Sequence, residues 1–145
     1  MTTSSIQELT ARVRAFADER DWQQFHTPKN LAMALTGEVG ELVGEFQWLT
    51  ADQSAAVMAD PELGPRVRAE LGDVTIYLVR LADVLGIDLV AAALDKLADS
   101  ARRYPVDQAR GSAAKARDKA EAHNKAAAHD KTEARDKAAA PDKTD

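Results

Sequence analysis

The chain has 145 residues, a formal net charge of −5 and no cysteine. A chain of this length can bury one hydrophobic core but not two, so one folded domain is expected. The absence of cysteine excludes disulfides, thiolate metal ligands and cysteine nucleophiles. The N-terminal sequence has neither a basic segment followed by an apolar one nor an apolar run of about 18 residues, which predicts a soluble, cytoplasmic protein without membrane contact.

The charge is divided unevenly along the chain. Residues 1–110 carry a net charge of −6, whereas residues 111–145 carry +1. Binding to a nucleic-acid backbone requires clustered positive charge, so no nucleic-acid partner is expected for the acidic part. A polyanionic substrate would need a cation to mediate its binding.

Two helices are predicted in the first third of the chain. Ser5 and a glutamate three residues later form the pattern of a capping box, and apolar residues at helical spacing continue to about residue 19. Thr27 has the side chain of an N-cap, and Pro28 stands at the first helical position. We therefore expect helices over residues 5–19 and 28–49.

Two further helices are predicted before residue 105. The third begins near Pro65, after a Gly-Pro break, and ends at Gly86, where glycine suits the end of a helix. Asp88 caps the fourth, which continues to Arg103 before a Tyr-Pro pair ends it. No segment shows the alternation of a strand, so the sequence predicts an all-α, four-helix bundle.

The last part of the chain, residues 111–145, has a different composition. It contains no Leu, Ile, Val, Met or aromatic residue, and from Asp118 it follows a six-residue repeat rich in alanine, lysine and aspartate. Six helical residues turn by about 600°, so successive repeats share no face. We expect a domain over residues 1–110 and a disordered, solvated tail. A basic interaction arm is the alternative, and the nearly balanced charge disfavours it.

Three glutamates interrupt the apolar sequence LTGEVGELVGEF, residues 35–46. With Glu38 at zero degrees on a helical projection, Glu41 lies at about 300° and Glu45 at about 340°, while the leucines and the phenylalanine lie at about 20° to 80°. The acids therefore border the apolar stripe of the second helix instead of opposing it.

The third helix repeats this arrangement. With Glu70 at zero degrees, Asp73 lies at about 300° and Tyr77 at about 340°, beside another apolar stripe. If the two helices pack side by side, four carboxylates converge at the margin of the core: Glu38, Glu41, Glu70 and Asp73.

Four converging carboxylates repel one another, and burial penalises their charged forms further. Either the side chains turn into water, as on an ordinary solvated acidic flank, or a hard cation such as Mg²⁺ lies among them. The spacing alone leaves both interpretations open. A di-iron site is disfavoured because neither acidic pair is followed by histidine at the Glu-x-x-His spacing.

Aromatic residues flank the second helix. Trp22, Phe25 and His26 precede it in a polar connector, and Trp48 follows near its end. Packing at a helix joint explains such residues, and stacking against a nucleobase is the functional alternative. Lys96 and Arg103 on the fourth helix complement the helix dipole or, near a metal, neutralise phosphates.

Taken together, the chain resembles the all-α nucleotide pyrophosphohydrolases related to MazG, and most closely their dCTP pyrophosphatase branch. The resemblance covers about residues 6–105. It rests on FADERDWQQFHTPKNLAMALTGEVGELVGEFQW, ELGDVTIYLVRLADVLGIDL and KLADSARRYP, which contain the ordered ExxE and ExxD pairs separated by 28 residues.

This resemblance implies a Mg²⁺-dependent hydrolase that cleaves a nucleoside triphosphate to monophosphate and pyrophosphate. Glu38, Glu41, Glu70 and Asp73 would bind the metal, and Glu41 and Glu45 are the candidates for activating the attacking water. The remaining site residues would bind substrate. Base-pocket candidates are Trp22, Phe25, His26 and Trp48, and the sugar or phosphate contacts are Tyr77, Lys96 and Arg103.

The resemblance also implies a homodimer or homotetramer with sites completed across subunits. Close relatives tend to carry histidine where Val13 stands and asparagine where Ser100 stands, so the base and sugar preference is left open. The alternative function is a catalytically silent helical binding or assembly module that keeps the fold. Retention of all four acids favours the enzyme, because a binding module has no reason to tolerate their repulsion.

Overall fold

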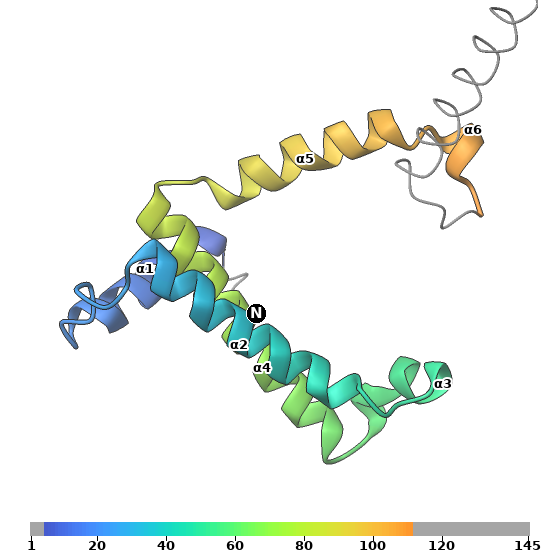
Figure 1. Cartoon of the computed structure of the whole chain (residues 1–145), viewed down its shortest axis with the longest axis horizontal. Coiled ribbons are helices and arrows are strands. Elements are labelled where there is room, and N and C mark those ends of the chain that lie inside the picture. Colours follow the sequence, from blue (N-terminus) through green and yellow to red (C-terminus); the bar gives the residue numbers. More distant parts are fainter. Residues whose placement is uncertain (1–4, 112–145) are drawn as a thin grey trace, which may run out of the picture. The chain divides into compact units, whose positions relative to one another are not determined.

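The computed structural model describes residues 5–111, and every regular element in that range is helical. The elements are α1 (Ile6–Asp18), α2 (Pro28–Phe46), α3 (Ala51–Ala55), the 3-10 helix η1 (Val57–Ala59), α4 (Leu63–Leu85), α5 (Leu89–Arg103) and α6 (Val106–Ala109) (Figure 1). The all-α class is confirmed. The four predicted helices correspond to α1, α2, α4 and α5.

The predicted helix starts owe their positions to side-chain caps. The Ser5 hydroxyl accepts a hydrogen bond from the backbone N–H of Glu8 at 3.1 Å, and the Thr27 hydroxyl accepts one from the N–H of Asn30 at 3.3 Å. The Glu8 carboxylate pairs with Arg12 at 2.6 Å. The cap of α1 is thus made by serine, while the glutamate that suggested a capping box supports the first turn through an i, i+4 ion pair.

The start of α4 differs from the prediction by two residues. One carboxylate oxygen of Asp60 accepts the backbone N–H groups of Glu62 and Leu63, each at 2.9 Å, and these bonds lower the pKa of Asp60. Helix α4 therefore begins at Leu63, and Pro65 lies in its first turn, where a missing N–H costs little. Gly64 lies against the preceding segment: an added Cβ would be 3.2 Å from the Met58 carbonyl oxygen.

The prediction for the end of α2 was three residues too long, and it missed the short helix that follows. Helix α2 ends at Phe46, and Thr50 with Gln53 forms a complete capping box for α3. This Thr-x-x-Gln signature is visible in the sequence. After Phe46 the chain turns, and α3 and η1 then lead it back to the start of α4.

The other end of α4 agrees with the sequence. Gly86 adopts a left-handed conformation with φ of 66°, which ends the helix, and the carboxylate of Asp88 accepts the N–H of Ala91 at 2.9 Å to begin α5. A residue with a Cβ is disfavoured at that φ, which explains why glycine stands there.

The chain divides into two units, residues 1–92 and 93–145, which are described separately. In the first unit, α2 packs along α4 and α1 packs against α4 (Figure 1). The two long helices are antiparallel, since Glu45 near the end of α2 meets Arg66 near the start of α4. Leu31 is the largest fully buried side chain, and Ala17, Val57, Val67, Val79 and Ala82 complete the described core.

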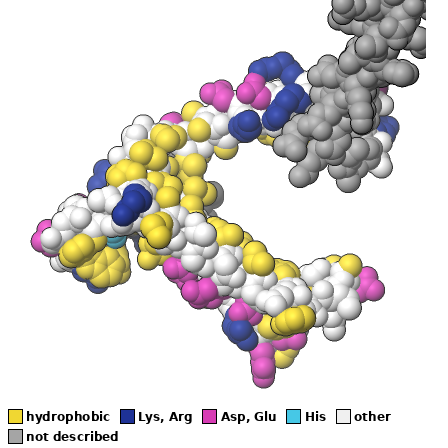
Figure 2. Space-filling view, in the orientation of Figure 1, with side chains coloured by type: hydrophobic (Ala, Val, Ile, Leu, Met, Phe, Trp, Pro, Cys, Tyr) yellow, Lys and Arg dark blue, Asp and Glu magenta, His cyan; other side chains and the backbone are white. Residues whose placement is uncertain are grey.

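This core is small for the apolar content of the unit. Many large hydrophobic side chains on α2 and α4 stay exposed, among them Met33, Val43 and Leu71, and yellow surface is prominent in Figure 2. Large exposed apolar patches are typical of protein–protein contacts, ligand-binding grooves and membrane contacts. None of the helices in the described range has the length and apolarity that a membrane span requires.

The second unit contains most of α5 and the single turn of α6. Tyr104 and Pro105 separate the two helices, as the predicted stop requires. The boundary between a domain of residues 1–110 and a tail stays a prediction. Apart from Gly111, the expected tail lies outside the described residues.

Candidate active site on helices α2 and α4

Three carboxylates meet near the middle of the antiparallel α2–α4 pair. Glu38 and Glu41 come from adjacent turns of α2 and Glu70 comes from α4, and one oxygen of each lies within 4.8 Å of the others. Acidic side chains gather along these two helices in Figure 2. The antiparallel packing brings them together because the midpoint of one helix faces the midpoint of the other.

Asp73 is the fourth carboxylate of the predicted set and lies on α4, one turn after Glu70. It is exposed and stands outside the group of three, yet its charge acts on both Glu38 and Glu70. The structure therefore gathers three of the four predicted ligands and places Asp73 beside them. Their assignment as metal ligands stays a prediction.

The electrostatics of this cluster are unfavourable for full ionisation. Partial burial raises the pKa of Glu38, and the charges of Glu41, Asp73 and Glu70 raise it further. Burial likewise raises the pKa of Glu70, with added repulsion from Glu41, Asp73 and Glu45, while Arg66 opposes the shift. Carboxylates in this condition bind a proton or a cation more readily than isolated ones.

Glu45 is held beside the cluster by a residue that the sequence did not indicate. Arg66, one turn before Glu70 on α4, donates to one carboxylate oxygen of Glu45 at 2.6 Å. The Glu45 side chain is only 10% exposed, and its second oxygen is buried without a hydrogen-bond partner. The Glu45 side chain is therefore largely removed from solvent. A buried, unpaired carboxylate oxygen is costly unless a ligand or water completes it.

The donor set suits a hard divalent cation. Carboxylate oxygens are the ligands that Mg²⁺ prefers, and it binds through a few of them while keeping several waters. The exposed side of the cluster, where Glu41 and Asp73 lie, leaves room for those waters or for phosphate oxygens. Soft or nitrogen-rich metal chemistry has no matching ligands among the clustered side chains.

The predicted base-pocket residues fall into two separate groups. Trp22 lies edge-on to His26 with ring centroids 6.0 Å apart, and Phe25 is exposed in the same connector. Trp48 follows the opposite end of α2 and is 85% exposed. The 19 residues of α2 span about 28 Å, so Trp22 and Trp48 of one chain cannot enclose the same base.

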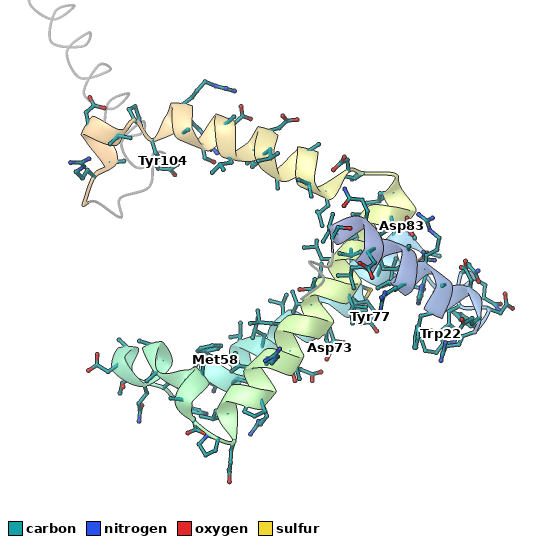
Figure 3. The ribbon with its side chains drawn as sticks, turned by 180° about the vertical axis from the view of Figure 1, so that it is seen from behind. Trp22, Met58, Asp73, Tyr77, Asp83 and Tyr104 are labelled. Carbon is teal, nitrogen blue, oxygen red and sulfur yellow. The ribbon has the colours of Figure 1, made fainter. Side chains whose placement is uncertain are left out.

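The remaining predicted contacts are distributed over both units. Tyr77 lies on α4 one turn beyond Asp73 and is partly buried (Figure 3). Lys96 and Arg103 lie on α5 in the second unit and are exposed, and Arg103 donates to the Ser100 hydroxyl at 3.4 Å. Their roles in substrate binding stay predictions.

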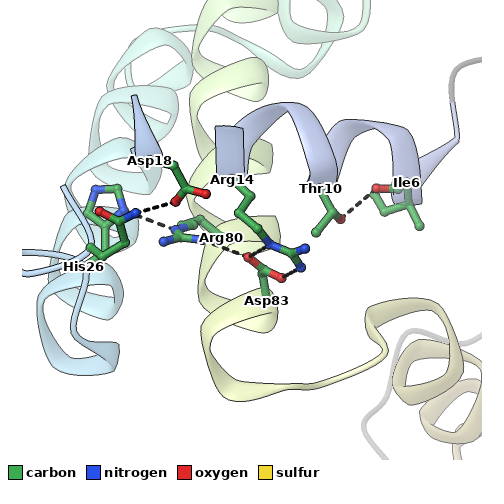
Figure 4. Close-up of polar contacts among 8 residues, drawn as sticks. Ile6, Thr10, Arg14, Asp18, His26, Arg80 and Asp83 are labelled. Atoms are coloured by element: carbon green, nitrogen blue, oxygen red, sulfur yellow. Dashed lines mark hydrogen bonds and ion pairs between the residues drawn. The ribbon is translucent and has the colours of Figure 1, made fainter. Parts of the chain in front are cut away.

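Sequence reasoning missed a polar network at the joint of α1, α4 and the connector (Figure 4). Arg80 donates to Asp83 at 2.8 Å and to Nδ1 of His26 at 3.2 Å, and Arg14 donates to both oxygens of Asp83. Arg14 is the main cause of the lowered pKa of Asp83. The i, i+3 spacing of Arg80 and Asp83 was visible, but the partners from other elements were not.

These features define an all-α protein with a carboxylate cluster between two antiparallel helices. Residues 34–118, which include all four predicted metal ligands, match the MazG-like family. The chain belongs to this family.

Individual relatives agree with the family match. The chain is 45% identical to dCTP pyrophosphatase 1 of Bos taurus over 117 residues, which cover 81% of the chain and 68% of that protein. It is 46% identical to dCTP pyrophosphatase 1 of Homo sapiens over 79% of the chain and 65% of the relative. A crystal structure of a pyrophosphatase from Archaeoglobus fulgidus is similar with a TM-score of 0.64 at 39% identity, covering 69% of this chain and 92% of that one.

Proposed function

We propose that the protein is a Mg²⁺-dependent pyrophosphohydrolase of deoxynucleoside triphosphates, with dCTP as the first candidate substrate. The products are the nucleoside monophosphate and pyrophosphate, and the proposed role is housekeeping of the cytoplasmic nucleotide pool. The observation that carries the proposal is the carboxylate group of Glu38, Glu41 and Glu70, found in a MazG-like chain with dCTP pyrophosphatase relatives.

The four predicted ligands, Glu38, Glu41, Glu70 and Asp73, would hold Mg²⁺ at this site. When bound, the ion supplies charge to offset the triphosphate and lowers the pKa of a water molecule. Burial and mutual repulsion raise the pKa values of Glu38 and Glu70, so their ionised forms are destabilised when no cation is bound. A bound cation would relieve the repulsion among these carboxylates, and this relief would favour its binding.

Glu45 is our first candidate for orienting or deprotonating the attacking water. Its buried second oxygen has no partner, whereas Arg66 fixes the first oxygen and hence the direction of the carboxylate. A general base needs an acceptor atom in a fixed position that the water can reach. Arg66 supplies the fixed position, and access to the buried oxygen would open when the site binds substrate. Glu41, which is exposed at the cluster, is the second candidate.

The base pocket requires a second copy of the chain if tryptophans from both ends of α2 take part. Trp22 with Phe25 and His26 would form one wall, and Trp48 of a partner subunit the other. The exposed hydrophobic side chains of α2 and α4 supply a surface for a homodimer or homotetramer. Sugar and phosphates would contact the remaining candidates, Tyr77, Lys96 and Arg103.

Pyrophosphate release by the purified full chain tests the proposal. With Mg²⁺ and a panel of ribo- and deoxynucleoside triphosphates, we expect turnover that is highest for dCTP, while Glu38→Gln and Asp73→Asn lower it at least 100-fold. Glu62→Gln removes a carboxylate outside the cluster and should keep the wild-type rate. If no triphosphate is cleaved, the catalytically silent helical module is the better account.

A further inference from the structure

Arg80 is the one buried charged residue in the part of the chain that the structure describes, with 6% of its surface exposed. Burying a guanidinium is costly unless its donors are satisfied. Two of its donors have charged or polar partners: the carboxylate of Asp83 on the same helix and the imidazole of His26. The cost of burying Arg80 is therefore offset by a defined arrangement at this joint (Figure 4).

The bond from Arg80 to His26 determines where the imidazole carries its proton. The guanidinium Nε–H can only donate, so Nδ1 of His26 must be unprotonated and accept. A neutral imidazole with a free Nδ1 carries its proton on Nε2. Burial lowers the pKa of His26, and the positive charge of Arg80 lowers it further, which keeps the ring neutral near pH 7.

Other charged groups at the joint do not compete for this ring. Asp83 of α4 is bound by Arg80 and by Arg14 of α1. Asp18 at the end of α1 accepts a hydrogen bond from the Gln23 amide at 2.6 Å. Arg80 is therefore the charged residue that acts directly on His26.

We infer that Arg80 is a positioning residue that locks His26 as the Nε2–H tautomer, so that His26 offers a bound base a hydrogen-bond donor and no acceptor. The inference rests on the proposed function, which places His26 beside Trp22 in the base pocket. Cytosine carries acceptors at O2 and N3 and a donor at its amino group. The locked Nε2–H would donate to an acceptor of the base, such as O2 or N3 of cytosine.

Nuclear magnetic resonance of the ¹⁵N-labelled full chain measures the tautomer directly. The signals lost in His26→Gln identify the ring, and we expect the Nε2–H form at pH 7.5. In Arg80→Met the ring should become a mixture of tautomers. Only the Nε2–H fraction can donate to the base, so KM for dCTP should rise by the inverse of that fraction, about 2-fold for an equal mixture, with kcat nearly unchanged. In Arg80→Lys a cation stays beside Asp83, but the Nε–H that donates to His26 is lost, so the same mixture is expected even if the methionine variant does not fold.

Arg14→Gln is the matched control, because it removes a guanidinium from Asp83 without touching His26. It should keep the tautomer and KM of the wild type. An Nδ1–H form in the wild-type protein, or an unchanged tautomer in the Arg80 variants, overturns the inference. A changed tautomer with an unchanged KM for dCTP overturns the hydrogen bond inferred between His26 and the base. A failure to cleave any triphosphate refutes the proposed function alone, since the resonances still decide the tautomer.

Discussion

Replacing Glu38 by glutamine should stabilise the metal-free protein while abolishing its response to Mg²⁺. Glu38 shares its surroundings with two carboxylates whose oxygens lie within 4.8 Å, and burial and repulsion both raise its pKa. At that separation two unit charges repel by about 1 kcal/mol with the permittivity of water. The neutral amide has nearly the same shape, so the variant loses the repulsion and keeps the packing.

The sign of this effect depends on pH. A carboxyl group whose pKa is raised by folding binds its proton more tightly in the folded state, so the metal-free protein loses stability as pH rises from about 4.5 through the raised pKa. Above that pH range Glu38 of the wild type is ionised, and the repulsion lowers the free energy of unfolding by its full amount. The advantage of Glu38→Gln should therefore be present at pH 7.5 and vanish near pH 4.

Thermal unfolding followed by circular dichroism, at low salt with EDTA or Mg²⁺, measures both effects. About 1 kcal/mol corresponds to roughly 4–8 °C for a unit of this size. We expect the variant to melt above the wild type in EDTA and to gain nothing from Mg²⁺, while the wild type gains stability by ligand binding. Glu62→Gln should show no such gain in EDTA. A lower melting temperature for Glu38→Gln in EDTA, or an intact Mg²⁺ shift, would refute the reasoning.

Three further outcomes are expected. Glu45→Gln should lower kcat about 100-fold with little change in KM in steady-state kinetics, because the amide oxygen will pair with Arg66 and leave an NH2 donor in place of the free acceptor. Gly64→Ala should destabilise by about 1–2 kcal/mol in urea unfolding, because its Cβ would be 3.2 Å from the Met58 carbonyl oxygen. Asp83→Asn should cost about 3 kcal/mol at neutral pH by leaving Arg80 without its ion pair. The pKa of Asp83 is lowered in the folded state, so this cost should shrink as pH falls below about 4, and a cost independent of pH would contradict it.

The sequence by itself determined the helices, because helix ends depend on local chemistry. The cap at Thr27 and the left-handed Gly86 follow from the residues at those positions. The errors were local too: the carboxylate of Asp60 reaches forward to begin α4, and Thr50 with Gln53 begins a short helix whose signature was overlooked. Periodicity also placed the acids at the edge of the apolar stripes.

The tertiary structure decided which side chains meet across elements, because such contacts depend on the direction and register of packed helices. Antiparallel packing of α2 on α4 brings Glu70 to Glu38 and Arg66 to Glu45, at separations in sequence for which no local rule exists. The same packing buries Arg80 against His26.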